Sequence, residues 1–118
     1  METYLPLMKH LQDWRANMHY KILVTKSFES DLDSVLLYIM GTLKNISAAG
    51  SLLKKVRDNI AMLDSPPLAF PVYPHISKKS YRFILVGNYL VFYHVDEEKG
   101  IVYIDRFLYS SRNIETII

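Results

Sequence analysis

Basic side chains gather in the last third of the chain, where they could meet phosphate groups. The basic residues from position 78 onward are Lys78, Lys79, Arg82, Lys99, Arg106 and Arg112. The acidic residues Asp96, Glu97 and Glu98 follow one another in a predicted turn, which leaves the flanking strands relatively basic. A basic strand face can bind the phosphates of a nucleic acid. Because the formal net charge is only +2, charge alone favours the simpler interpretation that these are solubilising surface residues.

Histidine is the other residue type that could support chemistry. His94 is the only histidine inside a predicted strand, and an unperturbed histidine pKa of about 6.5 suits acid–base work. A histidine on the solvent face of a strand more often has no special role, and we favour that interpretation. No histidines or carboxylates stand at metal-ligand spacing and the chain has no cysteine, so we expect no metal, cofactor or disulfide.

The length and composition are those of one globular domain. The chain has 118 residues, of which 50% are hydrophobic and 22% charged, and a chain of this size buries enough surface for a single core. No apolar run approaches the ~18 residues of a membrane span. The first residues lack a basic segment followed by an apolar core, so no secretory signal is evident. We therefore expect a cytoplasmic protein.

The N-terminal residues 1–17 look separate from the rest. Apolar side chains recur there at helical spacing, which predicts an amphipathic helix; they are Tyr4, Leu5, Leu7, Met8, Leu11 and Trp14. A new beginning follows at Met18, and residues 19–25 have the composition of a strand. We therefore predict an extension over residues 1–17 and a domain over residues 18–118.

Two helices should follow the first strand and form an antiparallel hairpin. Ser27 is the expected N-cap of the first helix, with Asp31 in its first turn, where negative charge suits the helix dipole. An apolar stripe of about four turns supports this helix; it consists of Phe28, Leu32, Val35, Leu36, Ile39, Met40 and Leu43. Asn45 is the expected stop, and Ser47 the expected cap of a second amphipathic helix that ends before Pro66.

Three strands complete the predicted domain. Residues 81–86, 89–95 and 101–108 have strand composition, and Gly87-Asn88 is a two-residue turn that closes a tight hairpin. The predicted fold is therefore α+β: an N-terminal strand and an antiparallel helical hairpin packed on a small antiparallel sheet.

This order of elements, together with particular sequence words, resembles the RelE/ParE (plasmid stabilisation) toxin family over about residues 19–118. Each word alone is weak, but the ordered set is fairly specific. The words are Phe28-Glu29-Ser30-Asp31-Leu32, Ala48-Ala49 with Leu52-Leu53, Pro66-Pro67, Tyr81-Arg82, Gly87-Asn88-Tyr89-Leu90-Val91-Phe92-Tyr93, and Arg106-Phe107-Leu108-Tyr109-Ser110-Ser111-Arg112-Asn113.

The resemblance implies the toxin of a type II toxin–antitoxin pair, with a cognate antitoxin as partner. Many members cut messenger RNA on the ribosome without a metal ion, whereas members of the ParE branch inhibit DNA gyrase. We rank the messenger RNA endonuclease first and the gyrase inhibitor a close second. A silent or structural domain that only shares the fold ranks third, because fold does not fix function.

Metal-free RNA cleavage needs a base, positive charge on the phosphorane and an acid. The resemblance implies Arg82, Arg106, Tyr109 and Arg112 as the catalytic set. RNA-binding residues would be Lys78, Lys79 and His94. Strand alternation predicts that Arg82, His94 and Arg106 converge on the open face of the sheet, provided that the faces of Tyr81 and Tyr89 pack on the helices. We also expect acidic groups of the antitoxin to cover the Arg82 face.

One position departs from the pattern of the RNA-cleaving relatives. These relatives often carry an arginine directly after the tyrosine of the strand that follows the turn, and here that position is Leu90. An apolar residue removes a phosphate contact that cleavage would use. This departure moves weight toward the gyrase-inhibiting branch, or toward a weakened toxin.

Overall fold

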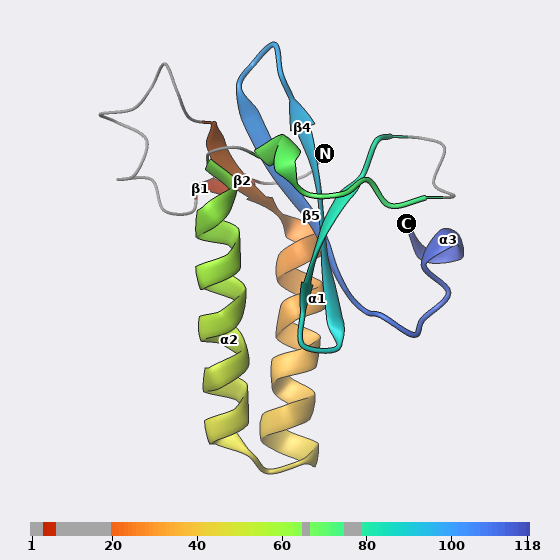
Figure 1. Cartoon of the computed structure of the whole chain (residues 1–118). Coiled ribbons are helices and arrows are strands. Elements are labelled where there is room, and N and C mark those ends of the chain that lie inside the picture. The colour runs from red at the N-terminus through yellow and green to blue at the C-terminus, as the bar shows by residue number, and fades with distance from the viewer. Residues whose placement is uncertain (1–3, 7–19, 65–66, 75–78) are drawn as a thin grey trace.

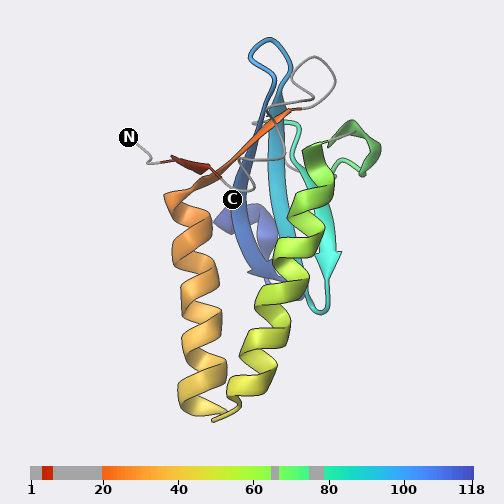
Figure 2. The same ribbon diagram turned by 90° about the vertical axis from the view of Figure 1, so that its left-hand side faces the viewer.

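A computed structural model describes residues 4–6, 20–64, 67–74 and 79–118. Two layers make up the fold: a five-stranded sheet, and a helical hairpin of α1 (Lys26–Leu37) and α2 (Ile46–Ala61) that packs on one face of it (Figures 1 and 2). The strands are β1 (Tyr4–Pro6), β2 (Lys21–Thr25), β3 (Arg82–Val86), β4 (Tyr89–Asp96) and β5 (Ile101–Tyr109), and a short helix α3 (Ile114–Ile117) follows β5. The α+β class and the helical hairpin are as predicted. Among the described residues, no helix has the length and apolar character needed to span a membrane.

The sheet is mixed, which corrects the expectation of an antiparallel sheet. Its order is β1-β2-β5-β4-β3, and β2 pairs with β5 in parallel while the other pairs are antiparallel. The three C-terminal strands form the predicted meander. β5, the last strand of the meander, lies beside β2. The long connection from β2 through the hairpin therefore decides that β2 and β5 run in parallel. No local pattern in the sequence carries this information.

The structure also corrects the predicted helix in the N-terminal extension where it can be compared. Tyr4–Pro6 forms β1, which pairs antiparallel with β2 from Tyr4 opposite Thr25 to Pro6 opposite Leu23. The edge of β2 offers N–H and C=O groups that a further strand can pair with. This pairing decides the conformation of residues 4–6, although the spacing of their apolar side chains predicted a helix. The remaining residues of that stripe, among them Trp14, lie outside the described residues. The division of the chain at residue 17 stays a prediction.

Both helices begin at other caps than expected. Thr25, the last residue of β2, caps α1: its Oγ1 accepts the Phe28 N–H at 3.1 Å and donates to the Asp105 carbonyl at 3.1 Å. Asn45 caps α2 by accepting the Ala48 N–H at 3.0 Å. Because β2 runs directly into α1, the residue with extended backbone just before the helix takes the cap, ahead of Ser27.

The loop between the helices is tight. α1 continues into a π-helical segment, Tyr38–Thr42, and Lys44 then adopts a positive φ of 53° before α2 begins. Short π-helical segments interrupt α-helices at places where the regular hydrogen-bond ladder is disturbed.

The sheet has a hydrophobic core on each face. The larger core lies between the sheet and the hairpin and contains Val56 and Ile60 of α2 together with Val91, Tyr93 and Ile104 of the sheet. The smaller core lies on the opposite face, which we call the open face, and consists of Leu90, Phe92, Leu108 and Ile114. The C-terminal helix α3 therefore covers part of the open face.

Candidate functional site

A β-bulge between β4 and β5 determines which side chains meet on the open face. Phe92 pairs with Arg106 and Tyr93 pairs with Ile104, so Asp105 is the extra residue of the bulge. A bulge bends the strand and redirects the side chains beside it. As a result Asp105 and Arg106 line the same depression, whereas neighbouring residues of a regular strand point to opposite faces.

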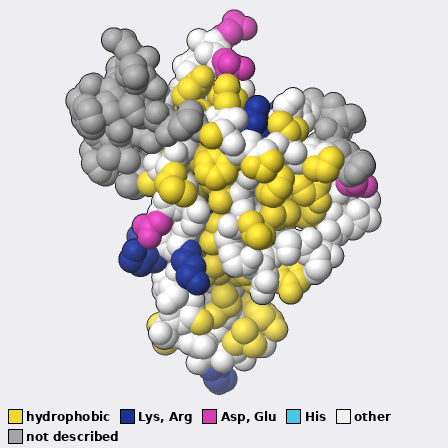
Figure 3. Space-filling view, viewed as in Figure 1, with side chains coloured by type: hydrophobic (Ala, Val, Ile, Leu, Met, Phe, Trp, Pro, Cys, Tyr) yellow, Lys and Arg dark blue, Asp and Glu magenta, His cyan; other side chains and the backbone are white. Residues whose placement is uncertain are grey.

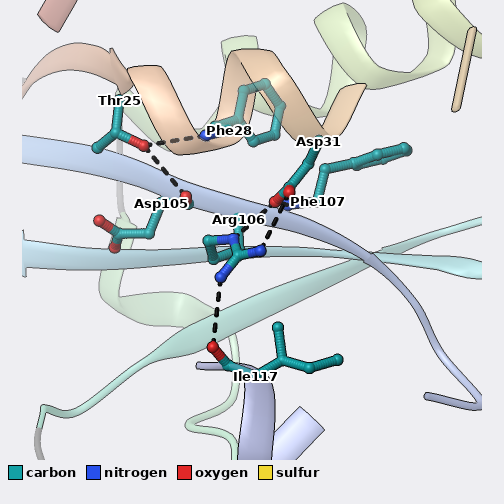
Figure 4. Close-up of polar contacts among 7 residues, drawn as sticks. All are labelled: Thr25, Phe28, Asp31, Asp105, Arg106, Phe107 and Ile117. Atoms are coloured by element: carbon teal, nitrogen blue, oxygen red, sulfur yellow. Dashed lines mark hydrogen bonds and ion pairs between the residues drawn. The ribbon is translucent and has the colours of Figure 1, made fainter. Parts of the chain in front are cut away.

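Arg106 is held by an ion pair to α1 (Figure 4). Its Nε and Nη2 donate to the two carboxylate oxygens of Asp31 at 2.7 and 3.1 Å, and its Nη1 donates to the Ile117 carbonyl at 3.4 Å. The same carboxylate accepts the Phe107 N–H at 3.0 Å. β2 ends beside Ile104, so Asp31 serves as the hydrogen-bond acceptor for the edge of β5 where the neighbouring strand has stopped.

His94 also has a partner, against the expectation of an unremarkable solvent-facing histidine. Its Nδ1 lies 2.5 Å from Oδ2 of Asp105. The ring stacks on Tyr103 with centroids 4.9 Å apart and meets the Tyr81 ring edge-on at 6.1 Å. The His94 side chain is 20% exposed and the Asp105 side chain 14%. A carboxylate on Nδ1 fixes the tautomer and leaves Nε2 as the atom that could exchange a proton.

Lys79 lines two depressions of the open face beside this pair. It lines one depression with Tyr81, Asp105 and Arg106, and a second one with His94. We call Lys79, Tyr81, His94, Asp105 and Arg106 the open-face cluster. Three of its members were predicted as site residues. Lys78 lies outside the described residues.

Acidic side chains dominate one rim of the open-face cluster. The second depression is lined, besides Lys79 and His94, by Asp96, Glu97 and Glu98 of the β4–β5 turn. This rim carries more negative than positive charge, so it disfavours a polyanion such as RNA.

Arg82 does not belong to the open-face cluster, which corrects the predicted convergence. It pairs with Tyr93, and its strand neighbours Ile84 and Val86 belong to the core on the hairpin side. Its Nη1 donates to the carbonyls of Leu68 and Phe70 at 3.1 and 2.6 Å. The predicted convergence assumed that the faces of Tyr81 and Tyr89 both pack on the helices. The Tyr89 face does so, but the Tyr81 face lies on the open side of the sheet.

Tyr93, a residue of the core, contacts the loop after α2, to which Arg82 also binds. Its hydroxyl donates to the Pro67 carbonyl at 2.5 Å, and burial raises its pKa to about 12, an effect that the charge of Arg82 partly opposes. Arg82 and Tyr93 together fix the loop after α2 to the sheet. Both therefore have structural roles that residue type alone did not indicate.

Tyr109 and Arg112 lie at the far end of β5. Tyr109 pairs with Tyr89, whereas His94 pairs with Tyr103. Tyr109 lies six positions after Tyr103, which corresponds to about 20 Å along a strand. Tyr109 and Arg112 are both exposed, so they do not join the open-face cluster. Burial raises the pKa of Tyr89, and the neighbouring hydroxyls of Tyr109 and Tyr38 add to this shift.

Sequence reasoning missed the two carboxylates that organise the site. From the sequence, Asp31 is interpreted only as a helix-dipole charge, and Asp105 has no assigned role. A signal was present for Asp105, which is an acidic residue inside the apolar strand segment 101–108, whereas Asp31 lies among other polar residues of α1 and carries no such signal. Within the part of the chain that the structure describes, no group of three or more His, Asp or Glu side chains could hold a metal ion.

Comparison with known protein families identifies the family of this chain. The family model described as the ParE toxin of the type II toxin–antitoxin system parDE matches residues 22–114. No curated protein matches the chain. The matched residues contain both helices of the hairpin, strands β3 to β5 and the whole open-face cluster.

Proposed function

The chain belongs to the ParE toxin family of type II toxin–antitoxin systems, and on that premise we propose that it arrests growth by binding DNA gyrase, without cutting messenger RNA. A cognate antitoxin partner follows from the family. The choice of gyrase is the proposal, and it depends on where the arginines lie.

The observation that carries the proposal is the separation of the two strand arginines. RNA cleavage would require cationic groups that converge on one phosphate. Arg82 lies on the hairpin side of the sheet and binds two backbone carbonyls, while Arg106 lies on the open face and is paired with Asp31. The positive charge of Arg106 is therefore already balanced, and Arg82 is not directed toward the same ligand.

The charge around His94 supports the same conclusion. Asp105 contacts the imidazole, and the rim formed by Asp96, Glu97 and Glu98 lies beside it. Such a surface repels RNA and is compatible with binding to a protein.

The expectation that the antitoxin covers a free Arg82 face needs revision for the same reason. Arg82 is occupied by the carbonyls of Leu68 and Phe70. Acidic groups of an antitoxin would have to compete with these internal bonds, so we no longer expect Arg82 to be a main contact.

A second candidate, cleavage of messenger RNA, is favoured by one observation: the His94–Asp105 pair beside Lys79. In that mechanism Nε2 of His94 would take the proton of a ribose 2′-hydroxyl. The 2′-oxygen would bond to phosphorus, the bond to the 5′-oxygen would break, and an acid would protonate that oxygen. Lys79 is the candidate for that acid or for a phosphate contact.

The experiment that separates the two candidates is inducible expression in a growing bacterium, with growth, messenger RNA ends and DNA damage measured together. We expect arrest with a DNA-damage response and intact messages. Purified toxin should also inhibit supercoiling by gyrase. New codon-phased 5′ ends on an abundant message would contradict the proposal.

The matched variants are His94→Gln and Asp105→Asn. Under the gyrase proposal both still arrest growth as long as they fold, because no proton transfer is involved. If the toxin cuts RNA, His94→Gln loses arrest while its thermal midpoint stays close to that of the unmodified chain. Lys99→Gln, an exposed change on the neighbouring turn, controls for a general effect of charge.

A further inference from the structure

Three tyrosines gather where the end of α1 meets the far end of the sheet. Tyr89 begins β4 and pairs with Tyr109 at the end of β5, and the two rings lie 5.5 Å apart at an angle of 67°. Burial raises the pKa of Tyr89, and the hydroxyls of Tyr109 and Tyr38 add to this shift, so the three hydroxyls are neighbours. We call Tyr38, Tyr89 and Tyr109 the tyrosine cluster, which is separate from the open-face cluster.

The position of Tyr38 follows from the geometry of α1. Asp31 of this helix binds Arg106 and the Phe107 N–H of β5. Seven residues make almost two turns of an α-helix, so Tyr38 continues the side of Asp31 toward the tip of the hairpin. The groove between α1 and α2 lies on another side of α1, and its lining contains none of the three tyrosines.

Much of the tyrosine cluster is accessible, and an arginine lies beside it. Tyr38 is 54% exposed and Tyr109 is 43% exposed. The N–H of Arg112 donates to the Tyr109 carbonyl at 3.1 Å. Its guanidinium is exposed and makes no hydrogen bond or ion pair within the described part of the chain. Tyrosine and arginine are two of the residue types that dominate the binding energy of protein interfaces.

The charges of the molecule are separated along the sheet. The acidic side chains of the β4–β5 turn lie at the end opposite to the tyrosine cluster, at the top of the view in Figure 3. Asp31, the carboxylate on the same side of α1 as Tyr38, is already paired with Arg106. The cation of Arg112 is therefore available to a carboxylate of another molecule.

We propose that the tyrosine cluster and Arg112 form the surface with which the toxin docks on its protein target. The tyrosine rings would pack on apolar side chains of the target, and the Arg112 guanidinium would bind one of its carboxylates. The inference rests on the proposed function, because it requires that the target is a protein.

The arrangement of the rings favours a protein over a nucleic acid. One face of Tyr89 is covered by Phe107, with ring centroids 4.9 Å apart and planes 15° apart. The Tyr109 ring is inclined to the Tyr89 ring, so the two offer no parallel platform on which successive bases could stack. A single exposed cation also gives a phosphate backbone little to bind.

The test measures binding of the full toxin, made by cell-free synthesis, to immobilised DNA gyrase by surface plasmon resonance. Tyr38→Ser and Tyr109→Ser each remove an exposed ring, and we expect each to weaken binding about tenfold or more, as for aromatic anchors of interfaces. Arg112→Gln removes the cation, and Arg112→Glu reverses its charge. Arg112→Glu should bind more weakly than Arg112→Gln, because it would face a carboxylate.

Matched controls change exposed residues of the same kinds elsewhere. Met62→Ser removes a side chain that is 51% exposed at the other end of α2. Lys99→Gln removes a cation from the β4–β5 turn. Both controls should bind gyrase like the unmodified chain. Circular dichroism and the thermal midpoint should be the same for all variants, which separates a loss of docking from a loss of folding.

Two results with gyrase would overturn the inference and leave the proposed function intact. One is equal affinity for the unmodified chain and for both tyrosine variants. The other is equal affinity for Arg112→Glu and Arg112→Gln, which would exclude the carboxylate contact.

If the unmodified chain does not bind gyrase, the proposed function fails, and growth arrest on induced expression decides the inference. Folded tyrosine variants that still arrest growth would overturn it. Loss of arrest in these variants, when the unmodified chain arrests growth and leaves messages intact, would support docking on another protein. Cleavage of messages that these variants abolish would assign the tyrosine cluster to RNA, and an unmodified chain without any effect on growth would overturn both proposals.

Discussion

The Asp31 carboxylate binds the Arg106 guanidinium at 2.7 and 3.1 Å and the Phe107 amide at 3.0 Å, across 75 and 76 positions of sequence. One side chain thus joins α1 to the edge of β5 beyond the end of β2. The pair is largely shielded, with 16% of the Asp31 side chain and 25% of the Arg106 side chain exposed. Through this contact the orientation of the hairpin depends on Arg106, a residue of the open face.

Replacing Asp31 should therefore destabilise the fold. Asp31→Asn removes the charge and leaves the guanidinium in a partly buried position without its counter-ion. We expect the free energy of unfolding to fall by about 2 kcal/mol, the range for hydrogen bonds to charged groups. Urea unfolding measures this change. Glu97→Gln, an exposed carboxylate of the β4–β5 turn, should cost almost nothing, and an equal loss in both variants would contradict the role of the ion pair.

Replacing Arg82 should loosen the loop after α2. Arg82→Ala leaves the carbonyls of Leu68 and Phe70 without their donor, and we expect a loss of about 1–2 kcal/mol. Hydrogen exchange should accelerate at the amides of Tyr73 and Phe83, which join this loop to β3. Arg112→Ala removes the same charge from an exposed site and should change neither quantity. Unchanged exchange in Arg82→Ala would show that the carbonyl contacts do not hold the loop.

Tyr93 should make the stability fall in alkaline solution. Burial raises its pKa from 10.0 to about 12 in the folded state. Between these values the unfolded chain has lost the phenolic proton while the folded chain keeps it, so the free energy of unfolding decreases as the pH rises from 10.0 toward about 12. Below this window the contribution is fully present.

The variant Tyr93→Phe tests this linkage. It should lose about 1–2 kcal/mol at neutral pH because the Pro67 carbonyl loses its donor, and its stability should fall less steeply in the alkaline window. Urea unfolding at a series of pH values measures both effects. Tyr20→Phe, at a half-buried position, should keep the original slope. If Tyr93→Phe also keeps the original slope, Tyr93 is not the residue that causes the alkaline loss of stability.

Lys44 offers a stabilising substitution. Its φ of 53° is in the left-handed region, where a side chain is strained. Lys44→Gly should relieve this strain and raise the stability by about 0.5–1 kcal/mol, after the extra flexibility of glycine in the unfolded chain is subtracted. Lys44→Ala keeps the Cβ atom and should give no such gain. Thermal unfolding of the two variants side by side would show whether backbone strain, and not the lysine charge, is responsible.

The sequence alone determined the elements whose signals are local. The apolar stripe from Phe28 to Leu43 predicted the first helix, and Gly87-Asn88 predicted the turn where Gly87 has a φ of 61°. The family resemblance also followed from words of a few residues, and the family match confirms it. These features depend on neighbours in the chain, so periodicity and residue type are sufficient to find them.

Only the tertiary structure decided which side chains meet. The bulge opposite Phe92 and Tyr93 brings Asp105 and Arg106 to one depression, and it breaks the alternation that would place these neighbours on opposite faces. The face of Arg82 depends on which side of the sheet the hairpin covers. Strand register, bulges and the choice of face result from pairings between residues far apart in the chain, and no periodicity within one segment encodes them.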